Sequence, residues 1–323
     1  KNYSIKNIHT RSTNQTNGCI NCKCEKPKDN WNELTIDVKI NYSVIVLAYD
    51  EGVDYRFVTD FPDSIKVMHE QADFNIANPA SAIVAETDNY TAWELSYTYP
   101  SFDNIPEDKH SITPALFTNK NGTRVVVAES DVLDYPGMYV QKAGNTMHGL
   151  WANYPAKTVM GSWGNFVSVV KERAPYIAYT KGSRNFPWRI VMVTGDDKSL
   201  LTNELIYKLA TPLQLKNASW IRAGKAAWEW WHDALLPGAD IPSGMDNRTT
   251  QLYNYYVDFA AKNHLEYMMI DAGWSNVYDI QKPNPKIDIR AVIDHAKSEH
   301  VGVFLWCVAA SLLKNLVANL DYI

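Results

Sequence analysis

The sequence predicts a chain of mixed β and α/β class, with an N-terminal antiparallel β-sandwich followed by the first part of a (β/α)8 TIM barrel. Between Trp31 and Thr194, short alternating segments are separated by Gly, Asn, Asp and Pro, as in antiparallel sheets. After Gly195 the pattern alternates between strand and helix, which favours parallel strands. The expected divisions are an irregular segment at 1–30, the sandwich at 31–212, and three β/α units of an incomplete barrel at 213–323.

Turn residues and alternation define the strands of the first part. Asp50 to Gly52 supplies a turn, and Asn121-Gly122 is the strongest short signal for a tight hairpin. The strands expected here are 34–40, 43–49, 53–57, 115–118, 124–128, 176–179 and 188–193.

The second part begins after a break at proline. Helical spacing from Leu200 to Leu209 ends at Thr211-Pro212, because a residue before proline is disfavoured in a helix, and this is the expected linker. One helical face is expected to carry Leu252, Tyr256, Phe259 and Ala260. The expected elements are strands at 225–231, 265–270 and 301–306, and helices at 249–263, 289–299 and 311–322.

Composition excludes two classes of partner. The net charge of −5 and the pI near 5.9 provide no basic field for nucleic acid. No apolar run approaches the roughly 20 residues that span a bilayer, so no membrane span is expected. The chain starts at Lys1 without an export signal, so either processing removed one or the segment comes from a longer protein. Oligomeric state stays open.

The cysteines give a weak metal signal. Cys19, Cys22 and Cys24 resemble half of a metal knuckle, but no second Cys or His pair with zinc spacing follows. A loop with a local disulfide or free thiols is the favoured interpretation. Cys307 is expected in an apolar strand, as a buried small hydrophobe.

Aromatic residues and one carboxylate gather where the barrel strands should end. Reactive side chains of parallel barrels lie at the carboxyl ends of the strands, so these residues form the candidate substrate site. The candidates are Trp228, Trp230, His232, Asp271 and Trp274. Alternation along a strand places Trp228 with Trp230 on one face and Trp231 on the other, unless the strand has ended. Because three strands cannot close a barrel, about five more units are expected after Ile323.

Five motifs together resemble glycoside hydrolase family 97, the calcium-dependent α-glucosidases and α-galactosidases of Bacteroidetes. The motifs lie at 49–57, 128–138, 180–189, 224–231 and 270–274, in the order of that family. The resemblance implies a β-sandwich, a (β/α)8 barrel and a small C-terminal β domain in a protein about twice this length. It also implies a periplasmic or secreted bacterial protein.

The resemblance implies one metal ligand in this chain. Family members hold an active-site calcium ion with glutamates, one of them from the sandwich, and by motif that residue is Glu129. The alternative for Glu129 is a solvated carboxylate at a strand end. The remaining ligands, and the acid that protonates the leaving oxygen, are expected beyond Ile323.

No catalytic residue is assigned within the chain. Glycoside hydrolysis needs two carboxyl groups, and only Asp271 is a strong barrel candidate. Asp271 bonds a sugar hydroxyl or orients a neighbour, or else it caps the loop at the backbone of Gly273 or Trp274. His232 replaces the Asn common in the family. For Arg184 and Arg189 the favoured interpretation is that they tie the sandwich to the barrel, and the alternative is contact with sugar.

The predicted function is hydrolysis of α-glycosidic bonds by an exo-acting α-glucosidase or α-galactosidase, with an oligosaccharide or α-glycoside as substrate. Stereochemical outcome stays open, and this chain alone is expected to be inactive. The alternative is a non-catalytic carbohydrate-binding or scaffold protein, or an inactive fragment of such an enzyme.

Overall fold

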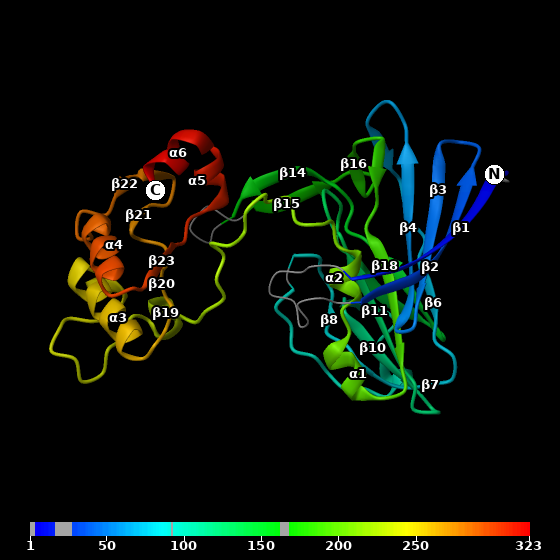
Figure 1. Cartoon of the computed structure of the whole chain (residues 1–323), viewed down its shortest axis with the longest axis horizontal. Coiled ribbons are helices and arrows are strands. Elements are labelled where there is room, and N and C mark those ends of the chain that lie inside the picture. The colour runs from blue at the N-terminus through cyan, green and yellow to red at the C-terminus, as the bar shows by residue number, and fades with distance from the viewer. Residues whose placement is uncertain (1–3, 17–27, 92, 162–167) are drawn as a thin grey trace. The chain divides into compact units, whose positions relative to one another are not determined.

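A computed structural model describes residues 4–16, 28–91, 93–161 and 168–323. The chain divides into two compact units, one of residues 1–158 with 170–214 and the other of residues 159–169 with 215–323 (Figure 1). Each unit has its own hydrophobic core and is described separately.

The first unit is built on a large antiparallel sheet. Its strand order is β1-β2-β3-β4-β18-β11-β10-β7, and β17 also pairs with β4. The Asn121-Gly122 hairpin between β10 and β11 is confirmed, with Gly122 at a φ of 87°. The strands are β1 (Ile5–Thr16), β2 (Lys28–Val38), β3 (Tyr42–Tyr49), β4 (Gly52–Asp60), β7 (Pro79–Ile83), β10 (Ala115–Asn119), β11 (Arg124–Ser130), β17 (Ser183–Asn185) and β18 (Trp188–Thr194).

A second sheet, of order β6-β13-β12-β9-β8, completes the sandwich. Apolar side chains from both sheets, including Phe74, Phe117, Val127 and Val140, form one buried cluster, as the packing of two sheets in a sandwich requires. The remaining elements are β5 (Ile65–Val67), β6 (Asp73–Asn75), β8 (Glu86–Thr87), η1 (Phe102–Asn104), β9 (His110–Ile112), β12 (Tyr139–Ala143), β13 (Thr146–Leu150), β14 (Pro155–Met160), β15 (Ser168–Arg173) and β16 (Ala178–Thr180).

Two short helices lie against β11 and β18 on the outer face of the large sheet, in place of the single helix expected at 200–209. Helix α1 (Asp197–Thr202) is capped by Asp196, whose carboxylate accepts the backbone N–H of Ser199 at 3.0 Å. Helix α2 (Leu205–Leu209) follows, and its buried Leu205 and Leu209 join a second cluster on the sheet's outer face. The expected helix was wrong because Asn203 is extended and interrupts it.

The second unit contains three parallel strands, as the sequence predicted. Strand β19 (Ala226–Trp228) pairs with β20 (Tyr267–Ile270), which pairs with β23 (Gly302–Leu305), all in parallel. Helix α3 connects the first two strands and α4 the next two, so these are β-α-β units. The other elements are η2 (Glu229–His232), η3 (Met245–Asn247), α3 (Thr250–Lys262), β21 (Ser275–Asn276), β22 (Asp279–Pro283), α4 (Ile289–Ser298), α5 (Ala309–Leu313) and α6 (Leu316–Tyr322).

Helix α3 packs on these strands, and three of the four residues that the sequence placed on one helical face are buried there. Thr249 caps it, and Leu252, Tyr256 and Ala260 are buried in the second core. Phe259, which the sequence placed on the same face, is 48% exposed. The expected helix at 311–322 is broken into α5 and α6.

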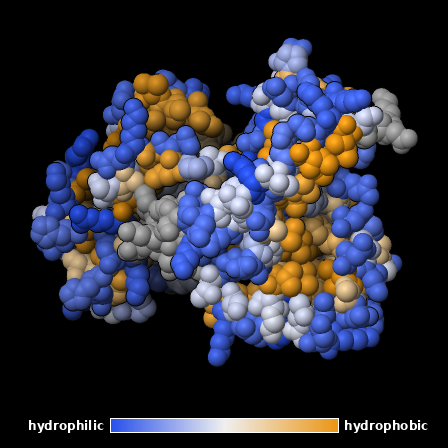
Figure 2. Space-filling view, turned by 45° about the vertical axis from the view of Figure 1, so that its right-hand side comes forward, coloured by the Kyte–Doolittle hydropathy of each residue, from blue (hydrophilic) through white to orange (hydrophobic). Residues whose placement is uncertain are grey.

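The surface of the second unit carries hydrophobic side chains, some of which are visible in Figure 2. The exposed ones include Phe304, Leu313, Leu316, Val317 and Leu320. Cys307 follows β23 instead of lying in it and is a free, half-buried thiol, whereas Cys19, Cys22 and Cys24 lie outside the described residues. Within the described ranges, no helix has the length and apolar character to cross a membrane.

Candidate functional site

Three indoles meet at the carboxyl end of β19. The strand expected at 225–231 ends at Trp228, where a 3₁₀ helix begins and carries Trp230 and Trp231 around a turn. The rings of Trp228 and Trp230 are stacked, with centroids 5.1 Å apart and planes at 24°. The ring centroid of Trp231 lies 6.3 Å from that of Trp228. The strand alternation that separated Trp231 therefore does not apply, and the three form one tryptophan cluster.

The tryptophan cluster presents apolar surface to solvent. Trp230 is 50% exposed and Trp231 is 75% exposed, while Trp228 is half-buried behind them. A rigid aromatic face of this kind stacks on the C–H face of a sugar ring, and indole adds an N–H donor at its edge.

Asp271 positions the innermost indole. Its Oδ2 accepts a hydrogen bond from Nε1 of Trp228 at 2.8 Å, and its Oδ1 accepts the backbone N–H of Ala272 at 2.5 Å. The carboxylate is buried. Of the expected roles, Asp271 thus orients a neighbour and caps the loop, although at Ala272 instead of Gly273 or Trp274.

A second carboxylate, Glu229, was missed by the sequence reasoning. It is fully buried, and its Oε1 accepts both the hydroxyl of Tyr253 at 2.9 Å and the backbone N–H of Asp271 at 3.0 Å. Burial raises the pKa of Glu229. The available signal was a glutamate inside an apolar strand sequence, which requires partners when buried. Glu229 therefore connects the ends of β19 and β20 to α3.

Two other predicted substrate contacts have different surroundings. Trp274 is only 1% exposed, and its Nε1 donates to the backbone carbonyl of Trp306 at 2.8 Å. It is part of the hydrophobic core, so the expectation that it faces substrate is corrected. His232 is exposed at the end of the 3₁₀ helix, and its ring stacks on Tyr256 with centroids 5.9 Å apart.

Glu129 in the first unit belongs to a buried ion-pair network. It lies opposite Arg189 in the β11–β18 pairing, and its Oε2 accepts from the guanidinium at 2.7 Å. Its Oε1 accepts the backbone N–H of Met138 at 2.8 Å. Arg189 also donates two bonds to Glu70, at 2.7 and 2.9 Å, and Tyr135 donates to the same carboxylate. Glu129 is therefore not the solvated strand-end carboxylate of the alternative interpretation.

The arginines expected to join the two units are bound within the first. Arg189 is 1% exposed and is held by Glu70 and Glu129. Arg184 donates to the backbone carbonyls of Leu133 and Asp134, and it also contacts the hydroxyl of Thr180. Both guanidinium groups therefore take acceptors of their own unit, and the interface role stays a prediction.

The described residues do not complete a calcium site around Glu129. Calcium takes six to eight oxygen ligands, and no group of three or more His, Cys, Asp or Glu in the described ranges is arranged to hold a metal. Arg189 lies beside the carboxylate, although its charge is already offset by Glu70. Glu129 keeps free lone pairs on both oxygens, so it fits the role of one ligand and no more.

Among the described residues, Asp271 and Glu229 are the carboxylates bonded to the tryptophan cluster and to each other's strand end. Asp271 and Glu229 are both buried and bonded to protein donors, which suits them to orient Trp228 and Tyr253. What this arrangement can do chemically is bind an apolar ring face and hold it in a fixed orientation.

Two family models match the chain. The model described as "Glycosyl-hydrolase 97 N-terminal" matches residues 1–212, and the model described as "Glycoside hydrolase 97" matches residues 230–322. The two matches together cover both compact units.

Curated relatives bear related names. A "Retaining alpha-galactosidase" of Bacteroides thetaiotaomicron is 33% identical over 293 residues, which are 86% of this chain and 44% of the relative. A "Probable retaining alpha-galactosidase" of Streptomyces bingchenggensis is 28% identical over 82% of this chain and 37% of its own length. The chain thus spans less than half the length of these curated relatives.

Solved structures share the fold. A glycoside hydrolase family 97 enzyme from Pseudoalteromonas sp. strain K8, in complex with acarbose, aligns with a TM-score of 0.74 and 21% identity, over 93% of this chain and 46% of that one. A β-arabinopyranosidase aligns with a TM-score of 0.70 and 19% identity, over 95% of this chain and 47% of that one.

Proposed function

The chain belongs to glycoside hydrolase family 97, and from that membership we propose that it supplies carbohydrate-binding surface to an enzyme that hydrolyses α-glycosidic bonds. The observation that carries the proposal is the exposed tryptophan cluster at the carboxyl end of a parallel strand, with Trp228 fixed by Asp271. This is the strand end at which parallel α/β enzymes bind substrate.

The proposed substrate is an α-galactoside that is cleaved from its end with retention. Support comes from the names of two curated relatives, both retaining α-galactosidases. Retention requires two carboxyl groups about 5 Å apart, one as nucleophile and one as acid and base. Because both oxygens of Asp271 accept from protein donors and Glu229 is fully buried, we assign neither of them to that pair.

The proposed setting of the cluster is a closed barrel. Three parallel strands with their connecting helices match the first units of a (β/α)8 barrel. The exposed Phe304 on β23, together with the apolar side chains of α5 and α6, provides surface on which further units would pack.

Replacing Trp230 with alanine tests the cluster. We expect the dissociation constant for melibiose, an α-galactoside, to rise about tenfold, because one of the three indoles is lost while Trp228 keeps its bond to Asp271. Isothermal titration calorimetry on the purified chain measures this directly.

The exposed Trp220 provides the matched control, since Trp220→Ala removes an indole of the same unit outside the cluster. Its affinity for melibiose should equal that of the unaltered chain. Equal loss in both variants, or no loss in Trp230→Ala, would contradict the assignment of the cluster.

The proposed cofactor is calcium, with Glu129 as one ligand. Support comes from the family motif and from the lone pairs that Glu129 keeps free. In a polypeptide of the relatives' length, Glu129→Gln should weaken calcium affinity at least tenfold in calorimetric titration, because a charged ligand is lost. The matched control is Glu33→Gln, which removes another sandwich carboxylate, and unchanged affinity in Glu129→Gln would refute the role.

Hydrolysis separates an enzyme from a binding protein. We expect 4-nitrophenol release from the α-galactoside by a polypeptide of the relatives' length and none from residues 1–323 alone. Release by residues 1–323 would show that a reacting carboxyl pair has been overlooked, and no release by either would favour the carbohydrate-binding or scaffold alternative. A periplasmic or secreted location is proposed from the family alone, and cell fractionation tests it.

A further inference from the structure

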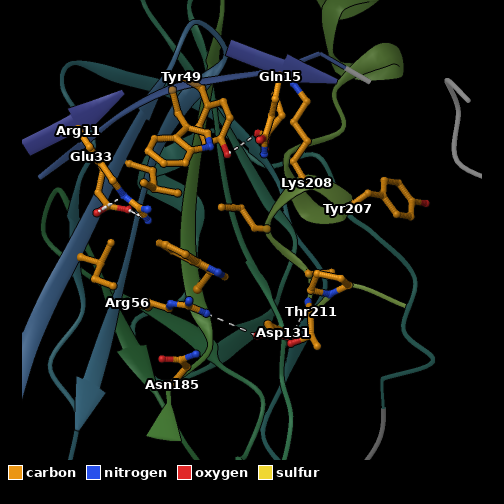
Figure 3. Close-up of a pocket in the computed structure, with 18 of the residues that line it drawn as sticks. Arg11, Gln15, Glu33, Tyr49, Arg56, Asp131, Asn185, Tyr207, Lys208 and Thr211 are labelled. Carbon is orange, nitrogen blue, oxygen red and sulfur yellow. Dashed lines mark hydrogen bonds and ion pairs between the residues drawn. The ribbon is translucent and has the colours of Figure 1, made fainter. Parts of the chain in front are cut away.

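A hollow of about 850 Å³ lies on the outer face of the large sheet in the first unit. Ile45, Leu47 and Trp188 line it from the sheet, and residues 210–213 after α2 line it opposite β1 and β2 (Figure 3). Its volume is in the range of about 300–1,000 Å³ that is typical of small-molecule sites. We call it the sandwich pocket, and it is separate from the tryptophan cluster, which belongs to the other unit.

Aromatic rings alternate with guanidinium groups in the sandwich pocket. The Arg11 guanidinium lies 5.0 Å from the ring of half-buried Trp31, and that of Arg56 lies 4.4 Å from the ring of Trp188. Tyr49 is also half-buried, and its hydroxyl donates to Asp29 at 3.0 Å. The rings are therefore held in place by neighbours before any ligand arrives.

One polar group in the sandwich pocket is left without a partner. The Nε of Arg56 is buried and makes no hydrogen bond within the described part of the chain, and the nearest carboxylate oxygen to this guanidinium is that of Asp131, 3.6 Å from Nη1. An unsatisfied buried donor costs on the order of 1–3 kcal/mol, so this part of the pocket wall is not satisfied by the described residues alone. The amides of Gln15 and Asn185 line the same hollow and offer both donors and acceptors.

Charge decides the class of ligand. Three cationic side chains line the sandwich pocket, namely Arg11, Arg56 and Lys208, and so do three carboxylates, namely Asp29, Glu33 and Asp131. Arg11 is already paired with Glu33, and Lys208 with Glu51. The three carboxylates would repel an anionic ligand, and the two arginines would repel a cationic one. A neutral ligand with many hydroxyl groups avoids both costs, because it donates to carboxylates, accepts from arginine and stacks its C–H face on a ring.

We propose that the sandwich pocket is a second, non-catalytic carbohydrate-binding site that takes a neutral di- or trisaccharide. It goes beyond the proposed function, which places substrate at the tryptophan cluster, and its volume suits two or three sugar rings. Catalysis is not assigned to it because Asp29 and Glu33 are bonded to protein donors.

The test measures raffinose binding by calorimetry in the whole chain carrying Trp230→Ala, in which the tryptophan cluster is impaired. We expect a residual binding event at the sandwich pocket. Adding Trp31→Ala or Arg56→Met should weaken this event at least tenfold, whereas Trp31→Phe should largely preserve it. Tyr179→Ala, which removes an exposed aromatic of the same unit outside the pocket, should leave it unchanged.

Three results would overturn the proposal: no residual binding in Trp230→Ala, residual binding that survives both pocket variants, or tighter binding of sulfate than of raffinose. Thermal unfolding shows whether Arg56→Met still folds. If it does not, the raffinose affinity of the variant with Trp31→Ala, at a half-buried position, tests the proposal alone. Failure of the proposed function has a different signature, since Trp230→Ala alone would then leave the total affinity unchanged.

Discussion

Replacing Arg189 with methionine is expected to lower the free energy of unfolding of the first unit by about 3–5 kcal/mol, the usual cost of removing one partner from a buried ion pair. The guanidinium is 1% exposed and holds Glu70 and Glu129. Without it, two carboxylates are left buried between the sheets with their charges uncompensated. For a unit of this size the melting temperature should fall by roughly 10 °C, as measured by circular dichroism.

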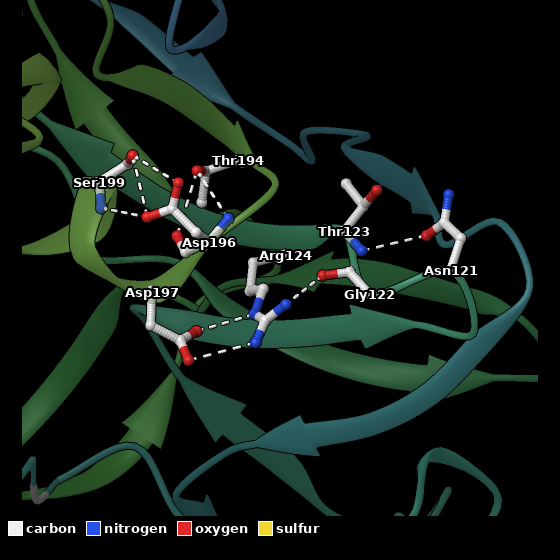
Figure 4. Close-up of polar contacts among 8 residues, drawn as sticks. All are labelled: Asn121, Gly122, Thr123, Arg124, Thr194, Asp196, Asp197 and Ser199. Atoms are coloured by element: carbon white, nitrogen blue, oxygen red, sulfur yellow. Dashed lines mark hydrogen bonds and ion pairs between the residues drawn. The ribbon is translucent and has the colours of Figure 1, made fainter.

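Arg124 provides the matched control on the surface. It donates through Nε to Asp197 at 2.7 Å, and its guanidinium also contacts the carbonyl of Gly122 (Figure 4). Because Asp197 is largely exposed, Arg124→Met should change the free energy of unfolding by no more than about 1 kcal/mol. Equal effects at Arg189 and Arg124 would contradict the importance of the buried network.

The sign of the pH dependence gives an independent check on Arg189→Met. Burial raises the pKa of Glu129 and Arg189 opposes that shift, so removing the arginine should raise the folded pKa of this carboxyl further above the unfolded value. The variant should therefore regain stability relative to the unaltered protein as pH falls from 7 toward 5. The double variant Arg189→Met/Glu129→Gln should recover part of the loss as well.

This network gives the family motif around Glu129 a structural explanation. Cross-strand pairing of β11 with β18 sets Glu129 opposite Arg189, and the backbone N–H of Met138 fixes the other oxygen. A side chain added at Gly137 would approach the Glu129 carboxylate to 3.2 Å and Trp93 to 2.9 Å. The motif thus holds one carboxylate rigidly, which serves folding and also suits a metal ligand.

Periodicity and turn chemistry predicted most strands because these are local properties. The hairpin at Asn121-Gly122 and the three parallel strands appear where expected. The failures occur where tertiary contacts override local pattern. Glu229 leaves the strand pattern to accept from Tyr253 and Asp271, so β19 ends early and Trp230 and Trp231 lie on a 3₁₀ helix.

The sequence predicted which residue types form the candidate site, but it did not predict which of these residues contact one another. Aromatic residues near a carboxylate indicated sugar binding, and Trp228 and Asp271 do meet. Sequence could not distinguish exposed Trp230 from buried Trp274, because the difference depends on whether a distant carbonyl, that of Trp306, accepts the indole N–H. Arg189 and Glu70 are 119 positions apart in sequence, so no local pattern joins them.

Asp54 presents the opposite situation from Arg189, because it is a buried ionisable group whose carboxyl oxygens have no hydrogen-bond partner in the described residues. It lies on β4 between Leu47 and Ile190 of the neighbouring strands, is fully buried, and neither carboxylate oxygen has a hydrogen-bond partner in the described residues. Burial, together with the charge of nearby Glu51, raises the pKa of Asp54 to about 8, although Lys208 opposes the shift. The side chain is therefore predominantly protonated at neutral pH in the folded protein.

Replacing Asp54 with asparagine is consequently expected to stabilise the first unit at pH 8 by a few kcal/mol, since each pKa unit corresponds to about 1.4 kcal/mol. The unfolded chain releases the proton near pH 4 and the folded chain near pH 8, so the stability contributed by this group is present below pH 4 and is lost as pH rises through that window. Urea unfolding from pH 4 to 8 should show a shallower fall in Asp54→Asn. Asp60→Asn, at the exposed end of β4, should keep the original slope, and identical slopes in the two variants would show that Asp54 is ionised and paired when folded.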